Sequence, residues 1–246
     1  MKAAIAFLFI LLAAGSAHPA DRTTNVGVQP MRVDVLRART PKPLGLALLL
    51  HTSGGVEQAD FDYADRLAAT GFTVAVPYFM AAYGVTPQRR QETWTRYRDE
   101  IYGDLKAAIA TVARAEGLDP ARSVAVGFSN GGHWATYLAA RGDVRKAVSY
   151  YGAYSEAGAD KALSTFSGLF SARSAPVLAF HGTDDDVVPV GAAKRLQAIA
   201  AAANAPLSMF YFDKAGHRFE RTGETRGPDA EATAAAWQRT VEFLAK

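Results

Sequence analysis

Short apolar runs alternate with longer segments of mixed polarity along most of the chain. Most of the apolar runs are continuous, which is typical of strands covered on both faces of a parallel sheet. The first run, residues 31–38, alternates apolar and polar positions and predicts an antiparallel or edge strand. The other predicted strands are residues 44–50, 72–76, 123–126, 146–150, 176–180 and 207–212.

Between these runs the apolar residues recur at helical spacing. The predicted helices are residues 58–69, 87–115, 132–141, 161–170, 192–203 and 229–245. Gly71 and the Asp119-Pro120 pair lie where helices are expected to end. Alternating strands and helices predict right-handed crossovers and one doubly wound α/β sheet. The connection after Tyr150 is short, so any cap over the sheet is expected to be small.

The N-terminal residues match a secretory signal peptide. Lys2 precedes an apolar run, residues 3–14, and small residues follow it. The run is shorter than the roughly 20 residues of a membrane-spanning helix. We expect cleavage after Ala17, with Ala20 as the alternative. The expected product is a periplasmic or secreted chain whose residues 18–246 form one domain.

Composition narrows the classes of function. Hydrophobic residues make up 49% of the chain and charged residues 21%, which indicates a folded protein with a large core. The net charge of +3 is small, and acidic residues interrupt the densest basic stretch, residues 89–98, so nucleic-acid binding is not expected. We interpret that stretch as the solvated face of a helix. The absence of cysteine excludes disulfides, thiolate metal sites and a cysteine nucleophile.

Residues 127–131 read Gly-Phe-Ser-Asn-Gly and match the pattern G-x-S-x-G. A predicted strand precedes them and a predicted helix follows, which is the sharp turn that lifts a nucleophilic serine clear of a sheet. The N-terminus of the helix also directs N–H groups at a developing negative charge. Ser129 is therefore the candidate nucleophile. A tight turn with a capping serine is the alternative.

A serine hydroxyl needs an adjacent base, which an acid in turn orients. Among five histidines, His217 lies in a loop directly after the last predicted strand, where it can reach Ser129; a surface loop histidine is the alternative. The acid is expected from the run Asp184–Asp186, after the preceding strand. A helix cap or a hydrated cation would also explain this run. The order Ser, Asp, His is that of α/β-hydrolases.

An oxyanion hole built from backbone N–H groups would complete such a site. One donor is expected at Asn130, directly after the candidate nucleophile. The other is expected in the glycine-containing loop 51–55, which follows the strand at residues 44–50. We choose Ser53 for this second donor, with Thr52 as the alternative. An ordinary glycine-rich turn would also account for the loop.

From about Val33 to the C-terminus, the sequence resembles the dienelactone hydrolase family. The segments that carry the likeness are residues 48–51, 64–68 with 71–72, 127–132, 181–182 with Asp185 and Val188-Pro189, and 215–219. The resemblance implies an α/β-hydrolase fold with a mostly parallel sheet of about eight strands and little or no cap. The family also places its catalytic acid ahead of a Val-Pro pair, with two residues between. This spacing selects Asp185 as the acid.

Three positions depart from the family pattern. The namesake enzymes have cysteine in place of Ser129 and glutamate in place of Thr52. Of the two arginines that hold the substrate carboxylate in the family, one is matched by Arg221, whereas Ala82 stands at the other position. The resemblance therefore implies a general serine esterase more than a hydrolase of dienelactone itself. An exposed salt-bridging arginine is the alternative for Arg221.

Aromatic residues follow the C-terminal ends of predicted strands, where open α/β sheets bind ligands. The candidate substrate contacts are Tyr78, Tyr83, Tyr151 and Arg221. Burial in the core is the alternative for the tyrosines.

The expected reaction is the hydrolysis of a small carboxylic ester, or of a lactone, through an acyl-enzyme on Ser129, with no metal and no cofactor. A peptidase or a polysaccharide deacetylase with the same three residues is the alternative enzyme. A non-catalytic binding protein on this fold is the alternative from another class.

Overall fold

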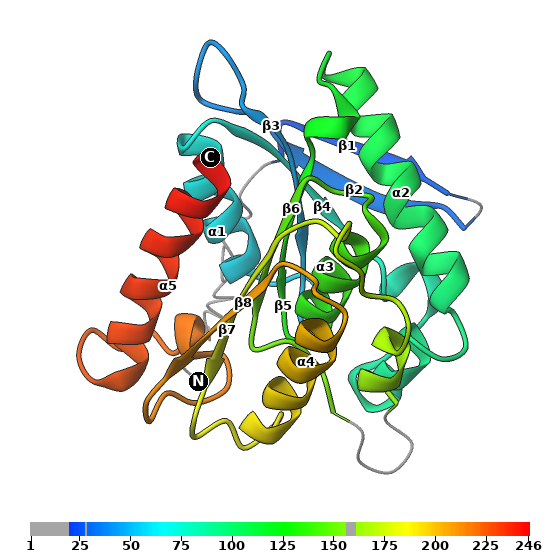
Figure 1. Ribbon diagram of the computed structural model, residues 1–246. Coiled ribbons are helices and arrows are strands. Elements are labelled where there is room, and N and C mark those ends of the chain that lie inside the picture. The colour runs from blue at the N-terminus through cyan, green and yellow to red at the C-terminus, as the bar shows by residue number, and fades with distance from the viewer. Residues whose placement is uncertain (1–19, 28, 156–160) are drawn as a thin grey trace, which may run out of the picture.

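The computed structural model describes residues 20–27, 29–155 and 161–246. An eight-stranded sheet crosses the molecule, and helices cover both of its faces (Figure 1). This arrangement confirms the predicted α/β class. The predicted signal peptide lies outside the described residues and stays a prediction. Among the described helices, none combines the length and the apolar character that a bilayer span requires.

The sheet has the strand order β1-β2-β4-β3-β5-β6-β7-β8. Its strands are β1 (Arg22–Val26), β2 (Met31–Leu36), β3 (Gly45–Leu50), β4 (Phe72–Pro77), β5 (Val124–Phe128), β6 (Lys146–Tyr150), β7 (Val177–Gly182) and β8 (Leu207–Phe212). Neighbouring strands from β4 to β8 pair in parallel, whereas β2 pairs antiparallel with both β1 and β4. The apolar runs predicted all of these strands except β1. That strand has mostly polar, exposed residues, so backbone pairing to β2 places it.

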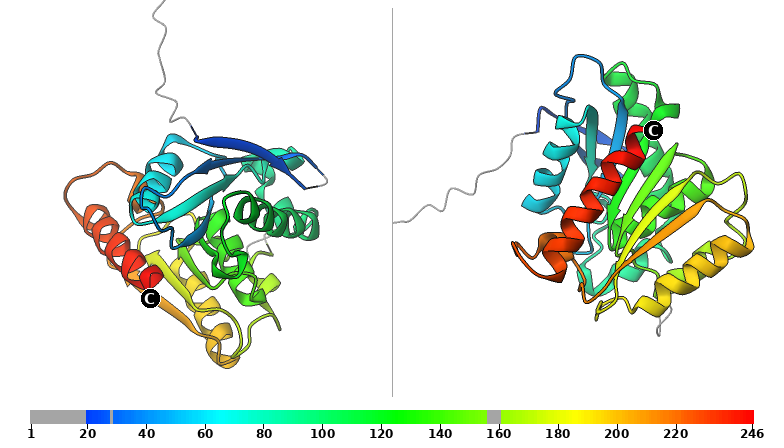
Figure 2. Two further views of the ribbon diagram at one scale, coloured as in Figure 1. Left: turned by 90° about the horizontal axis from the view of Figure 1, so that it is seen from above. Right: turned by 60° about the vertical axis from the view of Figure 1, so that its left-hand side comes forward.

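Two layers of helices enclose the sheet. The α-helices are α1 (Gln58–Ala69), α2 (Arg98–Ala115), α3 (Asn130–Arg141), α4 (Val190–Ala202) and α5 (Pro228–Ala245). The 3-10 helices are η1 (Ala81–Tyr83), η2 (Pro87–Thr93), η3 (Pro120–Arg122), η4 (Leu163–Phe166) and η5 (Phe219–Arg221). One face of the sheet packs against α2, α3 and α4, and the other packs against α1 and α5 (Figure 2).

Two predicted helices were wrong in extent. Residues 87–115 form η2 and α2, separated by a turn in which Trp94 is buried, so the chain bends into the core instead of continuing as one helix. Of residues 161–170 only η4 is helical. It ends at Phe166, because Ser167 is extended and the next residue, Gly168, has a φ of +70° that a helix does not allow.

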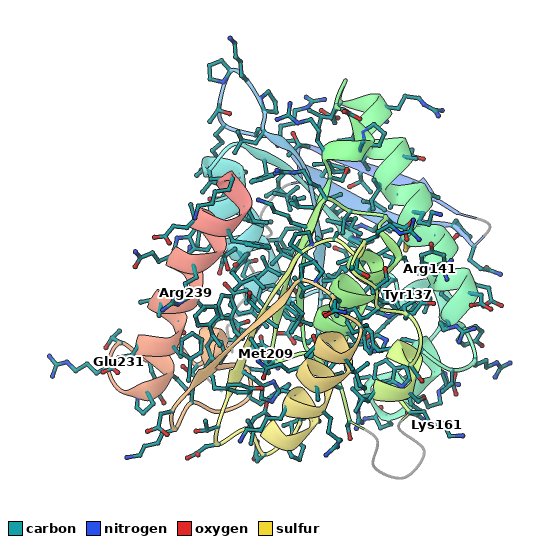
Figure 3. The ribbon with its side chains drawn as sticks, in the orientation of Figure 1. Tyr137, Arg141, Lys161, Met209, Glu231 and Arg239 are labelled. Atoms are coloured by element: carbon teal, nitrogen blue, oxygen red, sulfur yellow. The ribbon has the colours of Figure 1, made fainter. Side chains whose placement is uncertain are left out.

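Every residue of β3, β4 and β5 is buried, because helices cover both faces of these strands. Side chains fill the space between the layers, whereas the labelled Glu231 on α5 points away from the sheet (Figure 3). Because β3, β5, β6, β7 and β8 are parallel neighbours, their C-terminal ends meet at one edge of the sheet. Loops from five strands therefore converge there.

Candidate active site

Ser129 lies at the turn between β5 and α3 and is strained, with φ of 51° and ψ of −110°. The turn depends on the two glycines of the motif. A Cβ at Gly127 would lie 2.0 Å from the carbonyl oxygen of Gly131, and a Cβ at Gly131 would lie 2.0 Å from that of Leu50. Only glycine fits at both positions, so the sequence pattern has a direct steric cause.

The structure brings Ser129, His217 and Asp185 into one hydrogen-bonded row. The Nε2 atom of His217 lies 3.2 Å from the Oγ atom of Ser129, and its Nδ1 atom lies 2.7 Å from the Oδ2 atom of Asp185. The serine follows β5, the aspartate follows β7 and the histidine follows β8. These are the three sequence-predicted residues, and their geometry is that of a nucleophile, a base and an orienting acid.

Asp185 is the buried member of the run Asp184–Asp186. Its side chain is fully enclosed, and its Oδ1 atom accepts hydrogen bonds from the backbone N–H groups of Val187 at 3.0 Å and Val188 at 2.7 Å. The carboxylates on either side are exposed. Within the described ranges, no group of three or more histidine and acidic side chains is arranged to hold a metal ion.

The two loops predicted to supply the oxyanion hole lie beside Ser129. The backbone N–H of Gly131 donates to the carbonyl of His51 at 3.0 Å, which ties the start of α3 to the end of β3. Asn130 is the first residue of α3, so its backbone N–H belongs to the helix-terminal donors that have no acceptor one turn earlier. Its buried side-chain amide donates to the hydroxyl of Ser53 at 3.4 Å.

These residues border a pocket of about 340 Å³. It is lined by Thr52, Ser53, Gly54, Pro87, Arg90, Ser129, Ala153, Ser155, Val187, Val188, His217 and Arg218. Sequence reasoning missed most of this lining. Arg90 belongs to the basic stretch that we interpreted as a solvated helix face; it lies in η2, is exposed and lines the pocket. The Val-Pro pair after the aspartate run was the available signal for Val188.

Two of the three candidate tyrosines lie in other surroundings. The hydroxyl of Tyr78 donates to Asp34 on β2 at 2.9 Å, and the hydroxyl of Tyr83 donates to Asp104 on α2 at 2.6 Å. Tyr83 lines a different cavity, beside α2. Neither residue borders the pocket at Ser129, because each hydroxyl has an acidic partner elsewhere.

Tyr151 lies behind the histidine instead of in front of it. Its ring centroid is 4.6 Å from that of His217, and its buried hydroxyl donates to Glu220. The backbone of Tyr151 has a φ of +37°, which few residues other than glycine adopt. The Tyr151 ring therefore supports the imidazole of His217, and Tyr151 is not among the residues that line the pocket.

Arg221 is neither exposed nor directed into the pocket. Only 4% of its side chain is accessible, and its guanidinium donates to Asp60 at 2.6 Å and to Glu220 at 2.7 Å. It also lies 4.7 Å from the centre of the Phe128 ring. Burial opposes its charged form, but the surrounding negative groups hold the pKa of Arg221 above its ordinary value. Arg221 therefore forms salt bridges, as the alternative interpretation expected, but it is buried where that interpretation expected exposure, and it is not among the residues that line the pocket at Ser129.

The parallel sheet, the serine at the β5–α3 turn, and the acid and histidine after β7 and β8 define an α/β-hydrolase. Residues 33–246 match the model of the dienelactone hydrolase family, and the chain belongs to this family.

Named relatives support this assignment. A carboxymethylenebutenolidase of Pseudomonas putida is 35% identical over 161 residues, which cover 64% of this chain and 64% of the relative. A carboxymethylenebutenolidase of Rhodococcus opacus is 31% identical over 188 residues, which cover 74% and 73%. The chain thus spans just under two thirds of the first relative. The apo form of Thermogutta terrifontis esterase 2 shares the fold, with a TM-score of 0.72, 18% identity and coverage of 95% and 97%.

Proposed function

We propose that this protein hydrolyses carboxylic esters, lactones included, through an acyl-enzyme on Ser129. The observation that carries the proposal is the pair of contacts made by one imidazole, at 3.2 Å to the serine hydroxyl and at 2.7 Å to a buried carboxylate. The names of the relatives support ester chemistry, because a butenolide is a cyclic ester.

In the first step the Oγ atom of Ser129 attacks the ester carbonyl carbon while the Nε2 atom of His217 takes the hydroxyl proton. Asp185 orients the imidazole and stabilises the positive charge that forms on it. The backbone N–H groups of Asn130 and Ser53 donate to the oxyanion. When the tetrahedral intermediate collapses, His217 gives its proton to the departing alkoxide, and an alcohol leaves.

In the second step water replaces the alcohol. His217 takes a proton from the water, the resulting hydroxide attacks the acyl carbon, and the proton then passes to the Oγ atom of Ser129 as its bond to the acyl group breaks. A carboxylic acid is released and the serine is restored. For a lactone, the alcohol and the acid are parts of one product molecule.

The test is the variant Ser129→Ala, assayed with short p-nitrophenyl esters. Loss of the nucleophile should lower kcat by at least about 10³-fold. The far-ultraviolet circular dichroism and the melting temperature should stay close to the wild type, because the change removes one oxygen at a site that remains partly open. Near wild-type turnover by this variant would overturn the proposal.

A further inference from the structure

A second imidazole reaches the carboxylate of Asp185. His181 is fully buried near the end of β7, four residues before the aspartate. Its Nε2 atom lies 2.8 Å from the backbone carbonyl oxygen of Val188 and 3.2 Å from the Oδ2 atom of Asp185. The reaction steps proposed above do not use this residue.

The surroundings of His181 assign its tautomer. Both oxygen atoms beside Nε2 are acceptors, so Nε2 carries the hydrogen, which it donates to the carbonyl of Val188 while it faces Asp185. Burial lowers the pKa of His181 and favours the neutral ring, which leaves Nδ1 without a proton. In the described part of the chain, this Nδ1 atom is buried and has no hydrogen-bond partner. An unpaired buried acceptor lowers the stability of the folded protein. If this position served packing alone, an apolar side chain of similar size would give a more stable protein.

The carboxylate of Asp185 consequently has four polar neighbours, two beside each oxygen. The N–H groups of Val187 and Val188 donate to Oδ1, while His217 donates to Oδ2 and the Nε2 atom of His181 lies 3.2 Å from the same oxygen. The two imidazoles approach the same oxygen. A rotation of the carboxylate that moved Oδ2 away from His217 would break the contact with His181 as well. The orientation of the acid is thus fixed from two directions.

We propose that His181 is a positioning residue, which holds the carboxylate of Asp185 in the orientation that aims His217 at Ser129. This inference rests on the proposed function. It concerns how well the base is aimed and not how substrate is bound. Substitution should therefore lower kcat and leave KM nearly unchanged.

The experiment compares His181→Phe, His181→Gln and His181→Asn on a short p-nitrophenyl ester. Phenylalanine fills the space of the ring without a donor, and we expect kcat to fall about tenfold to a hundredfold at unchanged KM. Glutamine carries an amide N–H about as far from the backbone as Nε2, so it should recover part of the loss. Asparagine is too short to reach Asp185 and should not. If the Phe variant folds poorly, the ratio of kcat between the Gln and Asn variants still tests the inference.

Two controls separate positioning from general destabilisation. Val177→Ala shortens a buried side chain on the same strand without touching Asp185, and it should lower the melting temperature with little change in kcat. In an Asp185→Asn background, the loss caused by His181→Phe should largely disappear, because its target is already altered. Losses that multiply in the double variant, or a kcat that follows the melting temperature across all variants, would overturn the inference. A wild-type kcat in His181→Phe would also overturn it and leave the proposed function standing, whereas an active Ser129→Ala would remove both.

Discussion

At the residue scale, burial separates side chains that look alike in the sequence. Burial lowers the pKa of His51, and it lowers the pKa of His133 to about 3, so both rings are neutral at neutral pH. His51 stacks on Phe79 with ring centroids 4.2 Å apart. Of the histidines in the described ranges, only His217 lines the pocket at Ser129. The buried structural histidines thus differ from His217 in their surroundings, which the sequence alone does not show.

Burial also separates the three residues of the run Asp184–Asp186, since only Asp185 is buried. Substituting each of them in turn gives a matched series of variants. Asp185→Asn should lower kcat by about 10³- to 10⁴-fold, because an amide cannot hold the imidazole in the right tautomer or stabilise its charge. Asp184→Asn and Asp186→Asn alter exposed carboxylates of the same loop and should leave kcat within about twofold. Steady-state kinetics with one ester decide the matter. A larger loss at either flanking position would mean that the acid has been assigned to the wrong residue.

At the element scale, the loop between β8 and α5 carries both the base and a buried charge cluster. η5 places Glu220 and Arg221 under this loop, where the arginine joins Asp60 at the start of α1. The hydroxyl of Tyr151 donates to the same glutamate, and its ring supports His217. The arginine that matches a substrate-binding position of the family is therefore occupied inside the protein.

Because of this cluster, substitutions of two nearby arginines should lower the free energy of unfolding by different amounts. Arg221→Met removes the cation from buried carboxylates and should lower the free energy of unfolding by about 3–5 kcal/mol. Arg218→Met breaks a pair with Glu57 in which the arginine side chain is 42% exposed, and it should cost less than about 1 kcal/mol. Urea denaturation of both variants measures the difference. Equal small losses would show that Arg221 does not hold the loop.

At the scale of the whole molecule, the continuous apolar runs were enough to predict a parallel α/β sheet. The sheet buries these runs on both faces, so their pattern directly reflects the fold. The missed features depend on distant contacts. β1 is a polar strand that exists through pairing with β2, and the break between η2 and α2 follows from the burial of Trp94.

Some features of the site have local causes in the sequence, and others depend on distant contacts. The glycine-serine turn has a local steric cause, and the order of the three residues follows the order of the strands, so both are visible in the sequence. The pocket wall is not local, because Pro87, Arg90, Ala153 and Val187 meet only when loops from different strands converge. The tyrosines and Arg221 were misplaced because their acidic partners, such as Asp34, Asp104 and Asp60, come from other elements.

The proposed chemistry depends on the activation of the Ser129 hydroxyl by His217. The most direct measurement is intact-protein and peptide mass spectrometry after brief treatment with a fluorophosphonate, which labels activated serines. We expect one adduct, on the peptide that contains Ser129, and its formation should be at least about 10²-fold slower in His217→Ala. An adduct on another residue, or labelling of Ser129 at the same rate in the His217→Ala variant, would contradict it.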